Sequence, residues 1–496
     1  MDSNIWNIFL VLALFTLLRV FVVQRRSLLV SLFLHLLHPI RDRQGRQISG
    51  PPWIWANGHM IDKFLDGRAK SKEWRAYGAV YRIWSCGIPE IVITTAEDVR
   101  AFHSDSDQHA KSRSSNGGWF FHQLLGECMG LINGSRWKEV RGEFQHAFTH
   151  RAVMDMSPSI SQYARDYVKD ICSESSGPIV VHAANTLAKF PFFCTAKYLY
   201  GPLSREEKDE LWALGQRNLA LMRYVLAGGI YRFAMCRLFC TGTAKELDVF
   251  RRDWSNFNEK IYQTRRTSSP ACLIVSIWKP VKEGTMKESE VLQTISEMLF
   301  ANLDVSSHVL TWFVTLLAEN TEVQQRLREE VESSKVSGVV SGEYCNSKDS
   351  LLRSCWLESL RLRPFTSFAI PESSPSPKIL GGYQIPANAS IVVDTHSINI
   401  ENPLWGADTH QFRPERFAVI KPSELRYNFF AFGFGTRKCL GQHFAESMLK
   451  TFVVHLLDHY TVSIPSPSKH SGSGDYDLTR DSWVPTSNVH LILTKI

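Results

Sequence analysis

The longest regular pattern of apolar positions in the chain covers residues 289–319. This stretch has neither glycine nor proline, and its apolar residues recur every three or four positions, which is the spacing of one helix face. We therefore expect a single helix there, about 45 Å long at about 1.5 Å per residue. Residues 351–362 and 442–457 show the same spacing, and Pro364 is expected to end the first of these helices.

Short apolar runs next to turn-forming residues indicate a smaller β region. Residues 79–84 and 91–94 predict two strands, with residues 86–89 as the turn between them. Further short strands or turns are predicted at 380–386, 391–393 and 489–493. The patterns together predict a mainly α fold with a small β region.

Two apolar runs stand near the N-terminus. Residues 5–23 are almost wholly apolar, close to the roughly 20 residues that a membrane-spanning helix needs. Arg25 and Arg26 follow and no lysine or arginine precedes, so the charge bias places the C-terminal side in the cytosol. Residues 27–40 form a shorter run that we expect to lie in the membrane interface or to re-enter the membrane without spanning it. A cleaved signal peptide is the competing interpretation, but there is no basic segment before the run.

These features suggest three segments. We expect a single-pass membrane anchor at 1–26, an interfacial or linker segment at 27–50, and one catalytic domain at 51–496. The division rests on Gly50-Pro51-Pro52, a stiff hinge, and on the lack of a convincing linker after it.

Composition narrows the function classes. The formal net charge of +7 is a modest basic excess, which suits a membrane surface or an acidic protein partner. No basic cluster with interleaved aromatic residues is present, so we expect no nucleic-acid partner. The ten cysteines are scattered singly, which favours reduced thiols in a cytosol-facing domain over a disulfide framework.

The stretch 432–441 carries the clearest candidate chemistry. It places Cys439 in a glycine-rich loop just before a predicted helix, where backbone amides favour a thiolate. The glycines allow the backbone to pass close to a large flat group, and Arg437 is suited to binding a carboxylate. This combination suits a haem, with sulfur on iron and guanidinium on a propionate. The alternative for a lone cysteine is a buried structural role.

The spacing Phe-x-x-Gly-x-Arg-x-Cys-x-Gly over this stretch resembles the haem-binding loop of the cytochrome P450 family. The resemblance implies that Cys439 is the iron ligand of haem b (heme, iron protoporphyrin IX). It also implies that the other fixed positions of the loop help to bind the cofactor: Phe432, Gly433, Gly435, Arg437 and Gly441.

Two further motifs resemble the same family. Trp137 and Arg141 stand four residues apart and share one helix face; alone they suggest a packed tryptophan beside a solvated arginine, but in the family this pair reaches the haem propionates. Glu358 and Arg361 resemble the Glu-x-x-Arg helix, with Arg416 as a third partner from a Pro-Glu-Arg-Phe segment. The resemblance implies a buried structural network that braces the haem loop.

The middle of the long predicted helix resembles the oxygen-activating helix of the family, Ala-Gly-x-Asp-Thr-Thr, with Asp304 as the acid. Asn302 replaces the glycine, and Val305 replaces the threonine whose hydroxyl helps to deliver protons. Ser306 is one residue further on, about 100° away around an α-helix. We therefore take Asp304, Asn302 and Ser306 as candidate catalytic residues and leave the reaction type open.

The substrate pocket is predicted from positions next to these motifs. Residues 365–370 are expected to pass over the haem, and an arginine often found after this segment is replaced by Pro371-Glu372. The predicted pocket residues are Phe300, Ala301, Val305, Phe365, Phe368 and Trp483.

The resemblance implies a haem-dependent monooxygenase that uses O2 and oxidises a small, fairly apolar natural product, in fungal secondary metabolism. Electrons would come from NADPH through a flavoprotein, NADPH–cytochrome P450 reductase, docking near Lys438. The protein is expected at the endoplasmic reticulum membrane with a cytosolic catalytic domain. Two alternatives stay open: an atypical member that catalyses oxidative cyclisation, desaturation or rearrangement, because of Val305, and a non-catalytic haem-binding protein.

Overall fold

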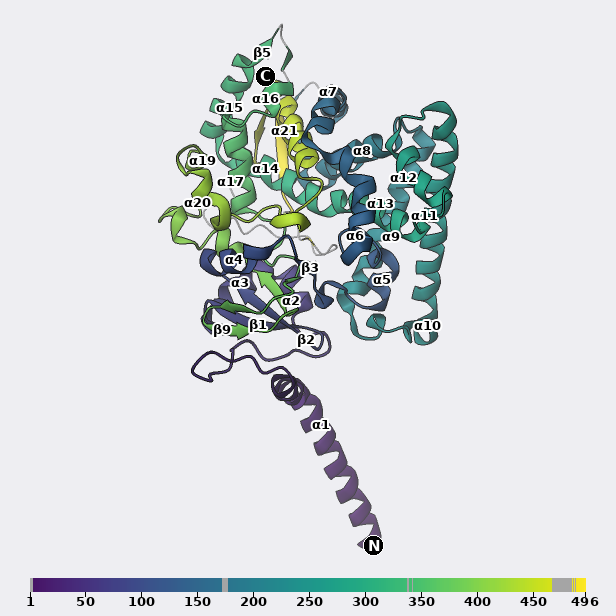
Figure 1. Ribbon diagram of the computed structural model, residues 1–496, viewed down its shortest axis with the longest axis vertical. Coiled ribbons are helices and arrows are strands. Elements are labelled where there is room, and N and C mark those ends of the chain that lie inside the picture. Colours follow the sequence, from purple (N-terminus) through teal and green to yellow (C-terminus); the bar gives the residue numbers. More distant parts are fainter. Residues whose placement is uncertain are drawn as a thin grey trace.

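The computed structural model describes residues 3–171, 177–336, 339–340, 342–465, 484, 486 and 488–496. Most of these residues are helical, and the strands are few and short (Figure 1). The longer helices are α1 (Ser3–Leu37), α6 (Gly134–Gln145), α7 (His150–Ile171), α8 (Ala183–Tyr200), α9 (Arg205–Ala227), α11 (Thr241–Ser268), α12 (Leu273–Lys282), α13 (Glu288–Ala301), α14 (Ser307–Glu319), α15 (Thr321–Ser333), α17 (Leu351–Leu362) and α21 (Gln442–His459). The shorter ones are α2 (Met60–Leu65), α3 (Gly67–Trp74), α4 (Ala96–Phe102), α5 (Trp119–Leu125), α10 (Cys236–Phe239), α16 (Gly342–Cys345), α18 (Thr395–Asn399), α19 (Arg416–Val419) and α20 (Pro422–Asn428).

The main sheet lies at the end of the molecule nearest α1 (Figure 1). Its strand order is β1-β2-β10-β7-β3, with β10 parallel to β2 and the other pairs antiparallel. A second sheet has the order β11-β12-β4, and two small hairpins are formed by β5-β6 and β8-β9. The strands are β1 (Val80–Ser85), β2 (Ile88–Ile93), β3 (Ala110–Lys111), β4 (Ile179–His182), β5 (Lys335–Val336), β6 (Val339–Val340), β7 (Glu372–Ser373), β8 (Lys378–Leu380), β9 (Tyr383–Ile385), β10 (Ser390–Val393), β11 (Tyr460–Ser463) and β12 (His490–Lys495).

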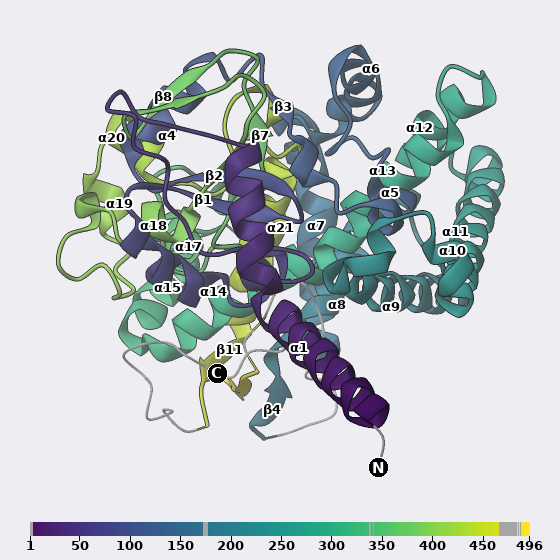
Figure 2. The same cartoon turned by 90° about the horizontal axis from the view of Figure 1, so that it is seen from below.

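The helical body is built around α14, in which every residue from Ser307 to Ala318 is buried. A helix that is covered on all sides needs apolar residues on all sides, and α14 is the most hydrophobic part of the long apolar pattern. Helix α21 packs along α7, and α8 and α17 pack against α14 (Figure 2). The family-like loop before α21 and the middle of the long helix are thereby brought into the same body.

The predicted mixture of helices and a small β region is confirmed. Helix α17 has the predicted bounds, and the two first strands are joined by a tighter turn than predicted, at Cys86 and Gly87. The long helix is not uniform: a π-helical turn, Asn302–Ser306, separates α13 from α14. One extra residue in a turn does not alter the apolar periodicity enough to be visible in the sequence, and such turns are frequent at functional sites.

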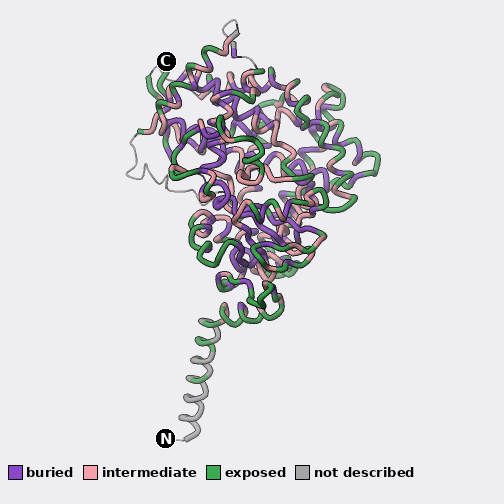
Figure 3. The backbone as a smooth tube through the Cα atoms, turned by 60° about the vertical axis from the view of Figure 1, so that its left-hand side comes forward, coloured by how far each residue is buried: buried purple, intermediate pink, exposed green. Residues whose placement is uncertain are grey.

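Helix α1 runs without a break through both N-terminal apolar runs, so the predicted division between them is not a break in the helix. It projects away from the rest of the molecule, and its described side chains are largely exposed (Figure 3). In the part of the chain that the structure describes, no helix combines the length and the apolar character that crossing a membrane requires, so the predicted span is not confirmed.

Candidate active site

The loop before α21 is closed on itself by a backbone hydrogen bond. The Cys439 amide donates to the Phe432 carbonyl over 2.9 Å. Gly433 and Gly435 have φ angles of +77° and +66°, a region that favours glycine. A Cβ atom on Gly435 would also lie 2.6 Å from Ser106, so this glycine permits the close approach of another segment.

The Cys439 thiol is both enclosed by protein and accessible. Its side chain is exposed, yet burial is the main influence on its pKa, which it raises above the usual value. The Gly441 amide, by donating to the sulfur, and the charges of Arg141 and Lys111 act in the opposite direction. In the protein without a cofactor, burial therefore outweighs the groups that favour the thiolate. A metal ion bound to the sulfur deprotonates such a group.

An accessible cysteine sulfur with a backbone amide directed at it fits a residue that would hold a haem iron. The neighbouring cations fit the carboxylates of the same cofactor. The guanidinium carbon of Arg437 lies 4.5 Å from the Trp137 ring centre, and that of Arg141 lies 5.3 Å from it. The indole is thus contacted by two cations, one from the loop and one from α6.

Arg437 is also fixed by its own hydrogen bonds. Its Nη1 and Nη2 atoms donate to the carbonyls of Ile132 and Gly130, over 3.0 and 3.2 Å. Burial lowers the pKa of Arg437 to about 10, which leaves it charged at neutral pH. The predicted residues Cys439, Arg437, Trp137 and Arg141 are therefore brought together by the fold.

The π-helical turn carries the three candidate catalytic residues. Asn302 and Asp304 are buried, while Val305 and Ser306 are half-buried. The Asn302 side-chain amide donates to the Met298 carbonyl over 2.6 Å. Because hydrogen bonds in this turn skip one more residue than in an α-helix, the 100° offset expected between Val305 and Ser306 was based on the wrong helix type.

Glu358, Arg361 and Arg416 form a buried network. Arg361 donates to both carboxylate oxygens of Glu358 over 2.7 and 2.8 Å, and Arg416 donates to Glu358 over 3.1 Å. Arg361 also donates to the Asn399 carbonyl over 3.0 Å, and the Asn399 side chain exchanges two hydrogen bonds with the Phe430 backbone. Phe430 stands two residues before Phe432, so the network reaches the candidate haem loop.

The predicted pocket residues fall into three groups. Ala301, Val305 and Phe365 are half-buried. Phe300 packs against Trp254 with ring centres 5.0 Å apart, and Phe368 is fully buried against Trp74. Both rings are thus held by packing against other aromatic side chains, and their contact with substrate stays a prediction. Trp483 lies outside the described residues.

Sequence reasoning missed Glu297, an acid on α13 near the predicted cations. Its carboxylate accepts a hydrogen bond from the Gly130 amide over 2.9 Å and another from the Cys128 thiol. Burial raises the pKa of Glu297, while the charges of Lys111 and Arg437 lower it. The available signal was an acid seven positions before Asp304, two turns away on the same apolar helix.

Comparison with known proteins agrees with this site. The cytochrome P450 family model matches residues 48–474. The chain is 39% identical over 485 residues to the cytochrome P450 monooxygenase hasH of Aspergillus fumigatus, covering 93% of this chain and 87% of the relative. It is 37% identical to the monooxygenase gliC of Aspergillus fumigatus (92% and 91% covered) and 35% identical to sirC of Leptosphaeria maculans (94% and 92% covered). The chain therefore belongs to the cytochrome P450 family, whose members are haem-thiolate oxidoreductases.

Proposed function

We propose that this monooxygenase oxidises a small, fairly apolar natural product in fungal secondary metabolism, with electrons from NADPH delivered by NADPH–cytochrome P450 reductase. The observation that carries the haem-dependent part is the contact of Trp137 with both Arg437 and Arg141, close to the accessible Cys439 thiol. Similarity to fungal monooxygenases over nearly the whole chain supports the enzymatic role.

Each residue has a distinct task in this proposal. Haem b, when bound, supplies the activation of O2, and the Cys439 sulfur would hold its iron. Arg437 and Arg141 would bind the propionates, with Trp137 holding the two guanidinium groups in place. Val305 cannot donate a hydrogen bond, and the Asn302 side chain is oriented by its donation to the Met298 carbonyl. Asp304 and the Ser306 hydroxyl are thus the groups proposed to hold and pass protons.

The first experiment is the carbon monoxide difference spectrum of the reduced, full-length protein. Thiolate ligation gives a strongly red-shifted Soret band, which should be absent in Cys439→Ser and present in Cys355→Ser, a fully buried cysteine on α17. Haem bound without the shifted band in the unmodified protein would contradict the proposed ligand.

A second candidate function rests on Val305. Loss of the threonine hydroxyl removes a usual proton donor, which favours an atypical oxidation such as ring closure or desaturation. Mass spectrometry after reaction with 18O2 distinguishes oxygen insertion from such an atypical oxidation. Label in the product indicates oxygen insertion, and a product lighter by two hydrogens without label indicates desaturation or cyclisation. Substrate-dependent and reductase-dependent NADPH consumption separates either from a non-catalytic haem protein.

The N-terminal segment is proposed to hold the enzyme at the endoplasmic reticulum membrane, with 1–26 as anchor, 27–50 as interfacial segment and 51–496 as the cytosolic catalytic domain. Support for the anchor comes from the exposed apolar side chains of Leu14, Val20 and Phe21 on α1. A chain lacking residues 1–26 should move from the membrane to the soluble fraction after alkaline carbonate extraction, and retention on the membrane would contradict the proposed anchor.

A further inference from the structure

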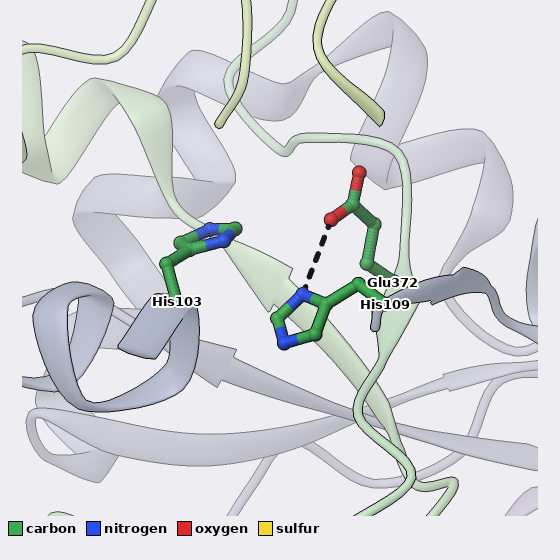
Figure 4. Close-up of side chains that lie close together, drawn as sticks. All are labelled: His103, His109 and Glu372. Atoms are coloured by element: carbon green, nitrogen blue, oxygen red, sulfur yellow. Dashed lines mark ion pairs between the residues drawn. The ribbon is translucent and has the colours of Figure 1, made fainter. Parts of the chain in front are cut away.

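A second cluster of ligand-type side chains lies beside the candidate haem loop. His103 follows α4, His109 precedes β3, and Glu372 begins β7 (Figure 4). Each of the three is no more than 9% exposed. The His103 ring lies 4.9 Å from the ring of Phe434, a member of the haem loop. The family resemblance does not account for this cluster, because Glu372 stands where an arginine is often found.

The spacing of the three side chains suits a metal ion. One nitrogen from each histidine and one oxygen from Glu372 lie within 4.8 Å of one another. His109 Nδ1 is 3.5 Å from Glu372 Oε2, which is too long for a good hydrogen bond. It matches the roughly 3.4 Å edge of a tetrahedron whose ligands lie about 2.0–2.1 Å from zinc.

The atoms that would bind the ion have no hydrogen-bond partners among the described residues. Among the described residues, neither ring nitrogen of His103 has a hydrogen-bond partner, and the same holds for His109 Nδ1 and Glu372 Oε2. Buried polar atoms are normally paired, because an unpaired one costs about 1–3 kcal/mol. Unpaired atoms on three side chains that face one another need a common explanation.

The groups behind the cluster orient it in the manner of a metal site. His109 Nε2 is 2.9 Å from the Asp105 carboxylate, which is in turn bound by Lys378 and Ser374. With Asp105 as acceptor, a hydrogen on Nε2 satisfies that nitrogen and leaves Nδ1, the nitrogen nearer Glu372, for a metal. A carboxylate behind a ligating histidine is a recurrent feature of zinc sites.

We propose that His103, His109 Nδ1 and Glu372 Oε2 bind one Zn2+ ion, with a water in the fourth position. Two imidazoles and one carboxylate form a ligand set that suits zinc better than it suits harder cations such as Mg2+ or Ca2+. Lys111 pairs with Glu372 Oε1 over 2.7 Å, which leaves Oε2 for the metal. The ion would join the end of α4, strand β7 and, through the His103–Phe434 contact, the haem loop.

The test measures zinc in the full-length, haem-loaded enzyme. The protein is exposed to excess Zn2+, dialysed against a weak chelator, and its zinc and haem are quantified by mass spectrometry and Soret absorbance. The unmodified enzyme should retain one zinc per chain, and His109→Gln and Glu372→Gln should lose it at unchanged haem content. His490→Gln is the matched control, because His490 lies beside His182 at an exposed site with ring centres 5.2 Å apart.

Two further measurements guard against misfolded variants and against zinc at cysteines. Lys111→Met removes a positive charge next to Glu372 and should raise zinc affinity several-fold. X-ray absorption at the zinc edge should show only ligands at about 2.0–2.1 Å, without the Zn–S distance of about 2.3 Å. No retained zinc in the unmodified enzyme, retention that survives Glu372→Gln, or sulfur ligands would each overturn the proposal.

Discussion

The guanidinium of Arg437 lies against the ring of Trp137, with 4.5 Å between the guanidinium carbon and the ring centre. The contact joins the loop before α21 to helix α6, two segments that are far apart in the chain. Because Arg437 also donates to the carbonyls of Gly130 and Ile132, the cation is held in place by protein groups alone. A preorganised cation costs less entropy when a carboxylate binds.

Arg437→Lys should therefore release haem faster. The lysine keeps the charge but cannot lie flat on Trp137 while donating to two carbonyls. The combined loss is about 2 kcal/mol, or roughly thirtyfold in the dissociation rate if association is unchanged. Transfer of haem to excess apomyoglobin measures that rate. Arg426→Lys, whose guanidinium lies over Tyr427 on the exposed helix α20, should behave like the unmodified protein.

Glu358→Gln should destabilise the whole domain. Glu358 and Arg361 are fully buried, so removing the carboxylate charge leaves the Arg361 guanidinium without a carboxylate partner and Arg416 with Asp408 alone. Such a change costs about 3–5 kcal/mol. Urea unfolding followed by fluorescence measures it. Glu415→Gln breaks an exposed pair with Arg326 and should cost no more than about 1 kcal/mol; equal losses in the two variants would contradict the bracing role.

Features encoded within a short stretch of the chain were predictable, whereas the helix type around Asp304 and the directions of side chains were not. Helix α17 is ended by Pro364 as its sequence indicates, and the spacing around Cys439 specifies the loop because all of its signal lies within ten residues. The π-helical turn at Asn302–Ser306 was missed, because it adds one residue to a turn and leaves the apolar pattern intact. The direction of Phe300 depends on contacts with Trp254, which no local pattern encodes.

Long-range pairing explains the remaining misses. Glu372 was noted only as a replacement for arginine, since its neighbours His103 and His109 come from a segment about 260 residues earlier in the printed sequence. The pairing of β7 with β3 brings them together. Register between distant strands is set by the tertiary fold, so single-sequence reasoning has no access to it.

His455 should make stability depend on pH below neutrality. Its Nε2 lies 2.8 Å from the Ser161 hydroxyl between α21 and α7, and burial lowers its pKa from 6.5 to about 4. Between these two values the unfolded chain binds a proton that the folded chain does not. The free energy of unfolding therefore falls as the pH falls, by about 3 kcal/mol over the window from this histidine.

The variant His455→Gln keeps a hydrogen-bonding side chain and removes the titration. Its unfolding free energy should fall less steeply between pH 6.5 and 4, the range set by the shifted pKa. Denaturant unfolding at several pH values measures the slope. Ser161→Ala is the matched control: it should lower stability by about 1 kcal/mol at every pH without changing the slope. An unchanged slope in His455→Gln would show that other groups govern acid sensitivity.

Val305→Thr tests whether the oxidation proceeds without a hydroxyl at this position. If Ser306 passes protons in its place, the new hydroxyl is redundant and the product should stay the same. Ser306→Ala should then lower the rate of product formation by about a hundredfold or more, the lower end of the usual range of about 10²–10⁴ for a lost proton-transfer group. If the reaction is a ring closure or desaturation, Val305→Thr should instead divert part of the flux to a hydroxylated product that contains label from 18O2.

The control for loss of packing is Ser307→Ala, which removes a neighbouring buried hydroxyl on α14. Equal effects of Ser306→Ala and Ser307→Ala would remove Ser306 from the proton path.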